Sequence, residues 1–116
     1  MELPWPVPPL WPNRRVHWSK KAAAAKKARR DAFVLTNSAI WAVWQKVAMR
    51  RIEKPVVTLS FRPPTKGRYD LDNALAALKS ALDGIAESLD VDDSHFSLVL
   101  KRGEPVKGGC VEVEIA

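Results

Sequence analysis

Six large apolar residues between positions 71 and 89 constrain the fold of this 116-residue chain more than any other feature. They are spaced by fours and threes without exception, which places them on one face of an α-helix; they are Leu71, Leu75, Leu78, Leu82, Ile85 and Leu89. Such a helix has to bury its apolar face against other elements. The length is that of one domain, so we expect a single domain over 1–116.

The residues before this helix divide into an extended segment and a second helix. The first 18 residues contain five prolines and three tryptophans, which excludes a helix and favours an N-terminal arm or an edge strand. A long helix is predicted over 19–51. Its expected apolar stripe consists of Ala25, Ala28, Ala32, Leu35, Ala39 and Val43.

Alternating apolar residues predict three strands in the rest of the chain. Segment 56–61 has the alternation of a half-buried strand, and segments 95–102 and 110–116 are expected to form a hairpin around the turn at 103–109. The order of elements predicts an α+β fold: a small mixed β-sheet with two main helices packed on one face.

Charge divides the sequence into two unlike parts. Residues 1–68 contain 15 Lys and Arg against 3 Asp and Glu, whereas residues 69–116 contain 4 against 10. A one-sided basic excess favours a polyanionic partner or an anionic membrane. No stretch is apolar enough for a membrane span and no secretory signal is present, so we expect a cytoplasmic protein without a membrane partner. The lone Cys110 excludes an internal disulfide and a cysteine metal cage.

Basic residues are densest within 17 positions near the N-terminus, and phosphate is their natural counter-charge. These eight are Arg14, Arg15, Lys20, Lys21, Lys26, Lys27, Arg29 and Arg30. Arg62, Lys66 and Arg68 precede an acidic segment and could hold a nucleic-acid strand beside it. The alternative is a solvated helix face.

Tryptophans are the other residues that could contact nucleic acid. Trp5, Trp11 and Trp18 could stack on exposed bases. We expect instead that they pack the N-terminal arm against the sheet or a partner subunit, and that Trp41 and Trp44 lie in the core or a dimer interface.

Aspartates form the candidate chemical site. Asp70 and Asp72 are separated by one residue, Leu71, so on extended backbone both carboxylates would lie on the same side of the chain. A second acidic pair, Asp92 and Asp93, follows the helix. Mg²⁺ prefers such oxygen ligands. The alternative is that Asp72 or Asn73 caps the helix and that the later pair consists of turn residues.

The sequence resembles the RusA family of Holliday-junction resolvases. The resemblance covers nearly the whole chain and is carried by Arg-Tyr-Asp-Leu-Asp-Asn at 68–73, the amphipathic helix after it, Asp92-Asp93, Gly-Gly-x-Val-Glu-Val near the C-terminus and Leu-Pro-Trp-Pro at 3–6. It implies a RusA-like, homodimeric, Mg²⁺-dependent endonuclease of bacterial or phage origin, which cuts four-way DNA junctions symmetrically in recombination and repair. It also implies that Asp70, Asp72 and Asp93 are the catalytic, metal-binding aspartates.

The sequence departs from the family at one catalytic position. The family usually carries a lysine three residues after the asparagine, where this chain has Ala76. Lys79 could replace it, because Lys79 and Asp83 keep the family's lysine-to-aspartate spacing. The alternative is that Lys79 only pairs with Asp83 on a solvated helix face. The chain would then be a non-catalytic or weakly active nucleic-acid-binding module; a protein-interaction domain that uses the proline-rich arm is a further alternative.

Overall fold

The computed structural model describes residues 1–44 and 54–116, and for residues 41–44 only the backbone. Its elements are β1 (Glu2–Pro4), η1 (Pro8–Leu10), α1 (Trp18–Trp44), β2 (Val56–Arg62), α2 (Leu71–Ala77), α3 (Lys79–Leu89), η2 (Asp93–His95), β3 (Ser97–Arg102) and β4 (Cys110–Ile115). The contacts predicted for Trp41 and Trp44, and the long helix beyond residue 44, lie outside the described residues. In the described ranges, no helix combines the length and apolar character needed to cross a bilayer.

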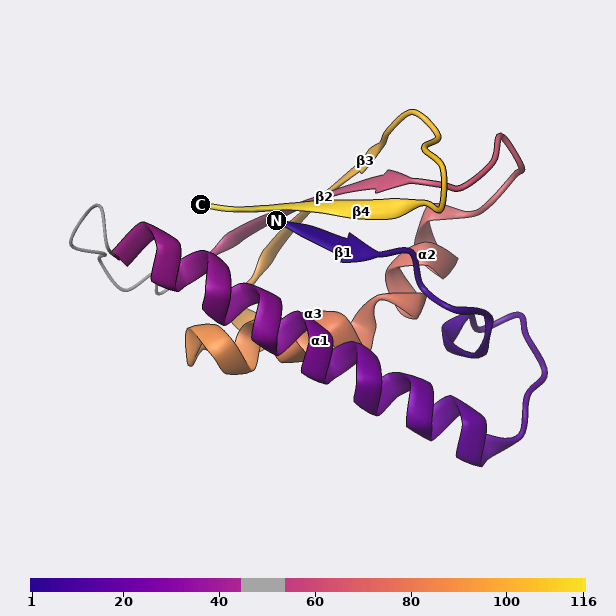
Figure 1. Cartoon of the computed structure of the whole chain (residues 1–116), viewed down its shortest axis with the longest axis horizontal. Helices are drawn as coiled ribbons and strands as arrows, with labels where there is room; N and C mark the ends of the chain where they lie inside the picture. The colour runs from indigo at the N-terminus through magenta and orange to yellow at the C-terminus, as the bar shows by residue number, and fades with distance from the viewer. Residues whose placement is uncertain (45–53) are drawn as a thin grey trace.

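The four strands form one mixed sheet in the order β1-β4-β2-β3 (Figure 1). In the central strand β2, Leu59 lies opposite Val113 of the antiparallel strand β4 and opposite Leu100 of the parallel strand β3. At one edge, β1 pairs antiparallel with β4. The predicted mixed sheet and the edge strand in the N-terminal arm are therefore confirmed.

The predicted hairpin between the last two strands is wrong, because β2 lies between β3 and β4. The parallel pairing of β2 with β3 requires a crossover connection, and α2 and α3 supply it. The segment expected to be a hairpin turn instead passes the end of β2. There the backbone N–H of Gly103 donates to the carbonyl oxygen of Phe61 at 2.8 Å, and that of Val106 donates to Pro63 at 2.9 Å.

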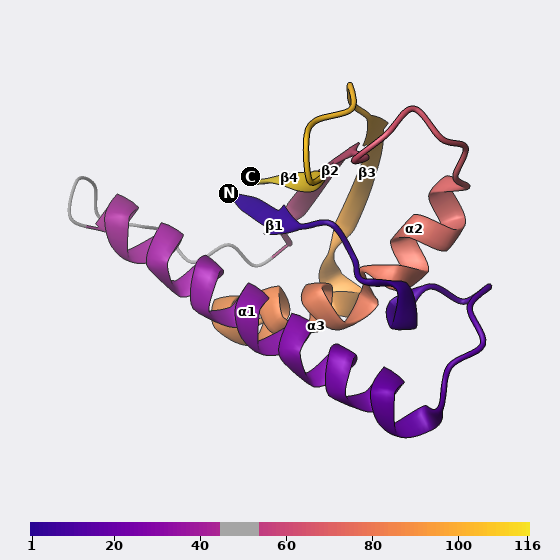
Figure 2. The same ribbon diagram turned by 45° about the vertical axis from the view of Figure 1, so that its right-hand side comes forward.

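The α-helices lie together on one face of the sheet (Figures 1 and 2). All six residues of the predicted stripe are buried or half-buried, which confirms it. The two-helix prediction is wrong in one respect, because the second helix is divided into α2 and α3 at Leu78 (φ −93°, ψ −2°). The core joins the helices to the sheet and includes Val57, Leu59, Phe61, Val111, Val113, Leu78, Leu82 and Ile85.

The buried face of α1 differs from the predicted stripe. Ala32 is buried, but the next core residue is Thr36, one turn later, whereas Leu35 is 37% exposed and Ala39 is exposed. The Thr36 hydroxyl donates to the carbonyl oxygen of Ala32 at 2.7 Å. This bond satisfies the hydroxyl inside the core, so the polar Thr36 is buried where the predicted stripe placed the neighbouring Leu35.

Tryptophan side chains pack the N-terminal arm against the rest of the protein. The ring of Trp5 makes edge contacts with Phe61 and Tyr69, at centroid distances of 6.3 and 5.5 Å, and lies 5.8 Å from the ring of Trp11. The expectation that the arm packs against the sheet is confirmed for Trp5, while Trp11 packs on Trp5 and against the core. Trp18, at the first position of α1, is 76% exposed, so within this chain it does not pack as expected.

Gly84 permits α1 and α3 to lie in close contact, since a Cβ at this position would be 2.1 Å from the carbonyl oxygen of Arg29. In an exposed helix Gly→Ala usually stabilises by about 1 kcal/mol. Here we expect Gly84→Ala to lower the free energy of unfolding by about 1–3 kcal/mol, because the helices must separate. Denaturant unfolding measures this, with Gly67→Ala as the control, since a Cβ there meets only the Thr65 hydroxyl at 3.4 Å. A stabilised Gly84→Ala variant would contradict the close contact.

Candidate functional site

Asp70 and Asp72 lie at the start of a helix and not on an extended strand. Asp70 has extended backbone (φ −91°, ψ 136°) at the N-cap position of α2, and Asp72 lies in the first turn. The prediction that both carboxylates lie on the same side of an extended segment is therefore wrong, because the helix begins at Leu71. The capping alternative also fails for Asp72 and Asn73, because Asp70 holds the cap position. Its side chain makes no capping bond to the backbone, accepts a bond from Nδ2 of Asn73 at 3.4 Å and stays exposed.

The first turn of α2 contributes to two open cavities. The first, which we call the Lys79 cavity, is lined by Asp72, Lys79 and Asp93; its apolar lining consists of Leu75, Ala76, Leu82, Phe96 and Leu98. The second, which we call the arm cavity, lies between the N-terminal arm and segment 63–73 and is lined in part by Asp70, Asn73 and Arg68. The structure thus brings Asp72, Lys79 and Asp93 to one cavity and places Asp70 in the neighbouring one.

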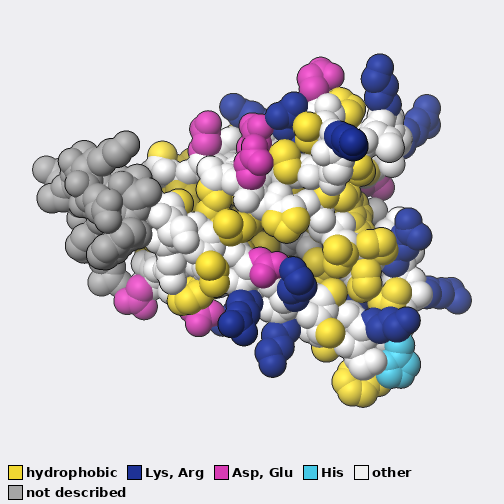
Figure 3. Space-filling view, in the orientation of Figure 1, with side chains coloured by type: hydrophobic (Ala, Val, Ile, Leu, Met, Phe, Trp, Pro, Cys, Tyr) yellow, Lys and Arg dark blue, Asp and Glu magenta, His cyan; other side chains and the backbone are white. Residues whose placement is uncertain are grey.

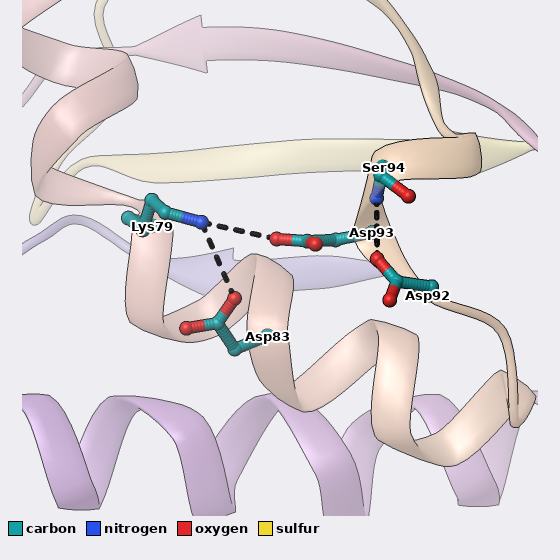
Figure 4. A network of polar contacts seen from close by, with 5 residues as sticks. All are labelled: Lys79, Asp83, Asp92, Asp93 and Ser94. Carbon is teal, nitrogen blue, oxygen red and sulfur yellow. Dashed lines mark hydrogen bonds and ion pairs between the residues drawn. The ribbon is translucent and has the colours of Figure 1, made fainter.

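Lys79 makes direct contact with one of the candidate aspartates (Figure 4). Its Nζ donates to Oδ2 of Asp93 at 3.0 Å and lies 3.5 Å from Oδ1 of Asp83. The local pair with Asp83 was one of the two alternatives from sequence. The shorter contact with Asp93 spans 14 residues, and no local pattern predicts it.

The two aspartates favour the protonated form of Lys79. The hydrogen bond to Asp93 raises the pKa of Lys79 above its ordinary value of 10.5, and the negative charge of Asp83 raises it further. Because the folded-state pKa is raised, the ion pairs are intact below the unfolded pKa and are lost only as the pH rises through the higher folded value. At neutral pH Lys79 is therefore a cation that can neutralise a phosphate, and not a general base.

Adjacent aspartates at the start of η2 have different roles (Figure 4). A carboxylate oxygen of Asp92 accepts the backbone N–H of Ser94 at 2.9 Å, which caps η2. This hydrogen bond lowers the pKa of Asp92. The turn-residue alternative therefore describes Asp92, whereas the Asp93 side chain reaches toward Lys79.

The three predicted metal ligands do not form a closed cage. Among the described residues, the three acidic or metal-ligating side chains whose ligand atoms lie within 4.8 Å of one another are Glu2, Cys110 and Glu112, at the β1–β4 edge. Asp72 and Asp93 instead enter the Lys79 cavity from α2 and η2. Mg²⁺ in proteins is usually held by one or two carboxylates together with waters and substrate phosphate. Asp72 is exposed and Asp93 is half-buried, so both carboxylates can reach solvent and offer the oxygen ligands that this ion takes.

The predicted nucleic-acid-binding residues are exposed, except for Arg62, which is half-buried. Lys and Arg side chains gather toward the right-hand end of the face in Figure 3. Three of the eleven are ion-paired: Lys27 with Asp31 at 2.5 Å, Arg29 with Glu87 at 2.9 Å and Arg62 with Glu112 at 3.0 Å. Arg62 also donates to the carbonyl oxygen of Glu104 at 3.1 Å. It therefore links the end of β2 to β4 and to the segment after β3, and is poorly placed to bind a nucleic-acid strand.

Two further residues belong to the surroundings of the arm cavity and were not predicted. Tyr69 lines it, and the Arg102 guanidinium lies 4.8 Å from the centre of the Tyr69 ring and donates to the Tyr69 carbonyl oxygen at 3.3 Å. Arg102 reaches this position because β3 pairs in parallel with β2, which places it opposite Phe61. A hairpin would pair β3 with β4 instead of β2, so the sequence pattern did not predict this contact.

The chain is similar in sequence to an uncharacterized bacterial protein. No protein-family model matches the chain. A protein of Xylella fastidiosa, described only as uncharacterized, is 41% identical over 96 residues, which is 83% of this chain and 61% of the relative. The chain thus spans about three fifths of the length of the relative it matches.

Proposed function

We propose that this protein is a Mg²⁺-dependent endonuclease that cuts branched DNA, with the four-way junction as its substrate. The observation that carries the proposal is the joint lining of the Lys79 cavity by Asp72, Asp93 and a protonated lysine. An enzyme that cleaves a phosphodiester needs a site for a metal ion and a positive charge near the phosphate oxygens. The Lys79 cavity offers carboxylates for the first and the ammonium group of Lys79 for the second. The sequence resemblance supplies the junction as the substrate.

Asp72 and Asp93 would hold the ion in the Lys79 cavity, while Asp70 lines the arm cavity. When bound, Mg²⁺ would activate a water molecule for attack and neutralise charge on the phosphate. Lys79 positions Asp93 through their 3.0 Å contact and offers its ammonium group to a phosphate oxygen. On the other side of α2, Arg14 and Arg68 line the arm cavity beside Asp70, where they offset the repulsion between that carboxylate and DNA.

A second copy of the chain would supply the second cut. A four-way junction has two equivalent strands, which a two-fold dimer can cut with matched sites. The edge strand β3 supports this proposal, because Val99 is 39% exposed on it and is absent from the lining of the Lys79 cavity. Exposed apolar edge strands are usually covered by another element or chain.

A cruciform plasmid tests cleavage and pairing together. With Mg²⁺ we expect linear DNA, produced by two cuts within the lifetime of one complex. With Ca²⁺ we expect binding without cuts. Nicked circles alone would contradict the dimer, and intact plasmid at every Mg²⁺ concentration would contradict the nuclease. A plasmid without the inverted repeat is the matched control for junction selectivity.

The alternative is a nucleic-acid-binding module without catalysis. The division of Asp70, Asp72 and Asp93 between two cavities favours it, as does Ala76 at the family's lysine position. This alternative predicts a complex with junction DNA that weakens steeply with salt and leaves the DNA intact. The plasmid experiment distinguishes the two functions, since the module would bind but never cut.

A further inference from the structure

The arm cavity has the size and the lining of a nucleotide-binding site. Its volume is about 540 Å³, within the range of roughly 300–1,000 Å³ found for small-molecule sites. Its lining combines aromatic rings, guanidinium groups and an amide; the residues used here are Trp5, Trp11, Tyr69, Arg14, Arg68 and Asn73.

The aromatic rings of this cavity are held in place before any ligand binds. Trp5 lies edge-on to Tyr69 at a centroid distance of 5.5 Å, and Trp11 lies 5.8 Å from Trp5 at an interplanar angle of 37°. The indole N–H of Trp11 donates to the carbonyl oxygen of Pro6 at 3.0 Å. All three rings are half-buried, so each keeps some exposed surface. Such fixed aromatic surfaces are what unstacked bases bind.

The cationic side chains of the cavity come from two separate parts of the chain. Arg14 follows η1 and Arg68 precedes α2; both are exposed, and neither has an ion pair with any residue in the described ranges. Guanidinium groups bind phosphate oxygens in bidentate geometry. Asn73, half-buried at the Asp70 end, offers an amide to the edge of a base.

We propose that the arm cavity binds a single unstacked nucleotide of the DNA, with its base against Trp5 and Trp11 and its phosphate between Arg14 and Arg68. The proposal rests on the proposed nuclease function, because Asp70 lines the same cavity and would place this nucleotide beside the cleaved phosphodiester. Bases at a branch point can leave the stack at lower cost than bases inside a duplex. The cavity would therefore favour branched over linear DNA by shape.

The indole N–H resonances of the five tryptophans can report binding of a 5′-phosphorylated thymidine dinucleotide without divalent ions. The resonances of Trp5 and Trp11, assigned through Trp→Phe variants, should shift and saturate, and that of Trp18 should not. Arg14→Gln should weaken binding by about tenfold, as expected for loss of a charge-assisted bond. Lys54→Gln removes a positive charge from an exposed position before β2, at the opposite end of this strand from Pro63 and Pro64 of the cavity lining, and should leave the affinity within about twofold.

Each contrary result has a separate meaning. If the dinucleotide shifts these resonances but the cruciform plasmid stays intact, the cavity binds nucleotide and the nuclease proposal is wrong. If the plasmid is cut but the Trp5 and Trp11 resonances do not move at millimolar dinucleotide, the nucleotide cavity is wrong. Equal responses to inorganic phosphate and to the dinucleotide would also overturn it, because no base would then contribute.

Discussion

Asp93→Asn should reduce Mg²⁺-dependent junction cleavage by at least about 100-fold, since a metal-binding carboxylate supports several kcal/mol of transition-state stabilisation and each 1.36 kcal/mol is tenfold in rate. Junction binding should be retained or strengthened, because the variant removes a negative charge that repels DNA. The fold should be kept, since the contact between Asp93 and Lys79 is exposed and such pairs contribute at most about 1 kcal/mol. Single-turnover cleavage and thermal unfolding of the same preparation measure both effects.

Asp92→Asn is the matched control for this prediction. It removes the same charge from the adjacent position, but the asparagine side chain can still accept the Ser94 N–H and cap η2. We expect its cleavage rate to stay within about threefold of wild type, because Asp92 is absent from the lining of the Lys79 cavity. Equal losses in the two variants would show a general charge effect, and wild-type cleavage by Asp93→Asn would remove Asp93 from the site.

Local patterns in the sequence predicted those parts of the fold that depend on which face of an element is buried. The stripe from Leu71 to Leu89 and the alternation of Val57, Leu59 and Phe61 both describe faces that meet in the core. Local patterns do not indicate which strand a given strand pairs with. Segment 97–102 alternates equally well in a hairpin or in a parallel pair, so the pattern did not indicate that β3 lies beside β2.

The candidate site was predictable as a set of residues but not as a geometry. Asp70, Asp72 and Asp93 could be chosen from the sequence, yet their arrangement depends on where extended backbone turns into helix. That transition falls at Leu71, which separates the first two carboxylates into different cavities. The contact of Lys79 with Asp93 depends on the course of the chain after α3, and no spacing rule covers it. The relative positions of these side chains therefore depend on contacts between distant parts of the chain, which local sequence patterns do not predict.

Lys79→Met should lower the cleavage rate by about 100-fold with little change in junction affinity, because a single preorganised charge at the reacting phosphate is typically worth 10²–10³ in rate. Lys79→Arg should restore part of this loss, since it keeps the charge and can still contact Asp93. Asp83→Asn removes only the longer 3.5 Å contact and should stay within about threefold of wild type, because exposed i,i+4 pairs contribute little.

The pH dependence separates a cationic from a basic role of Lys79. Its raised pKa keeps it protonated, so over roughly pH 6–9 Lys79→Met should lower the rate by the same factor at every pH and leave the shape of the profile unchanged. A general base would behave differently, because wild-type activity would rise as Lys79 loses its proton and the variant would lose that rise. A profile that changes shape in Lys79→Met would therefore contradict the cationic role, while Lys79→Met with the wild-type rate would leave the lysine with a purely structural contact to Asp93.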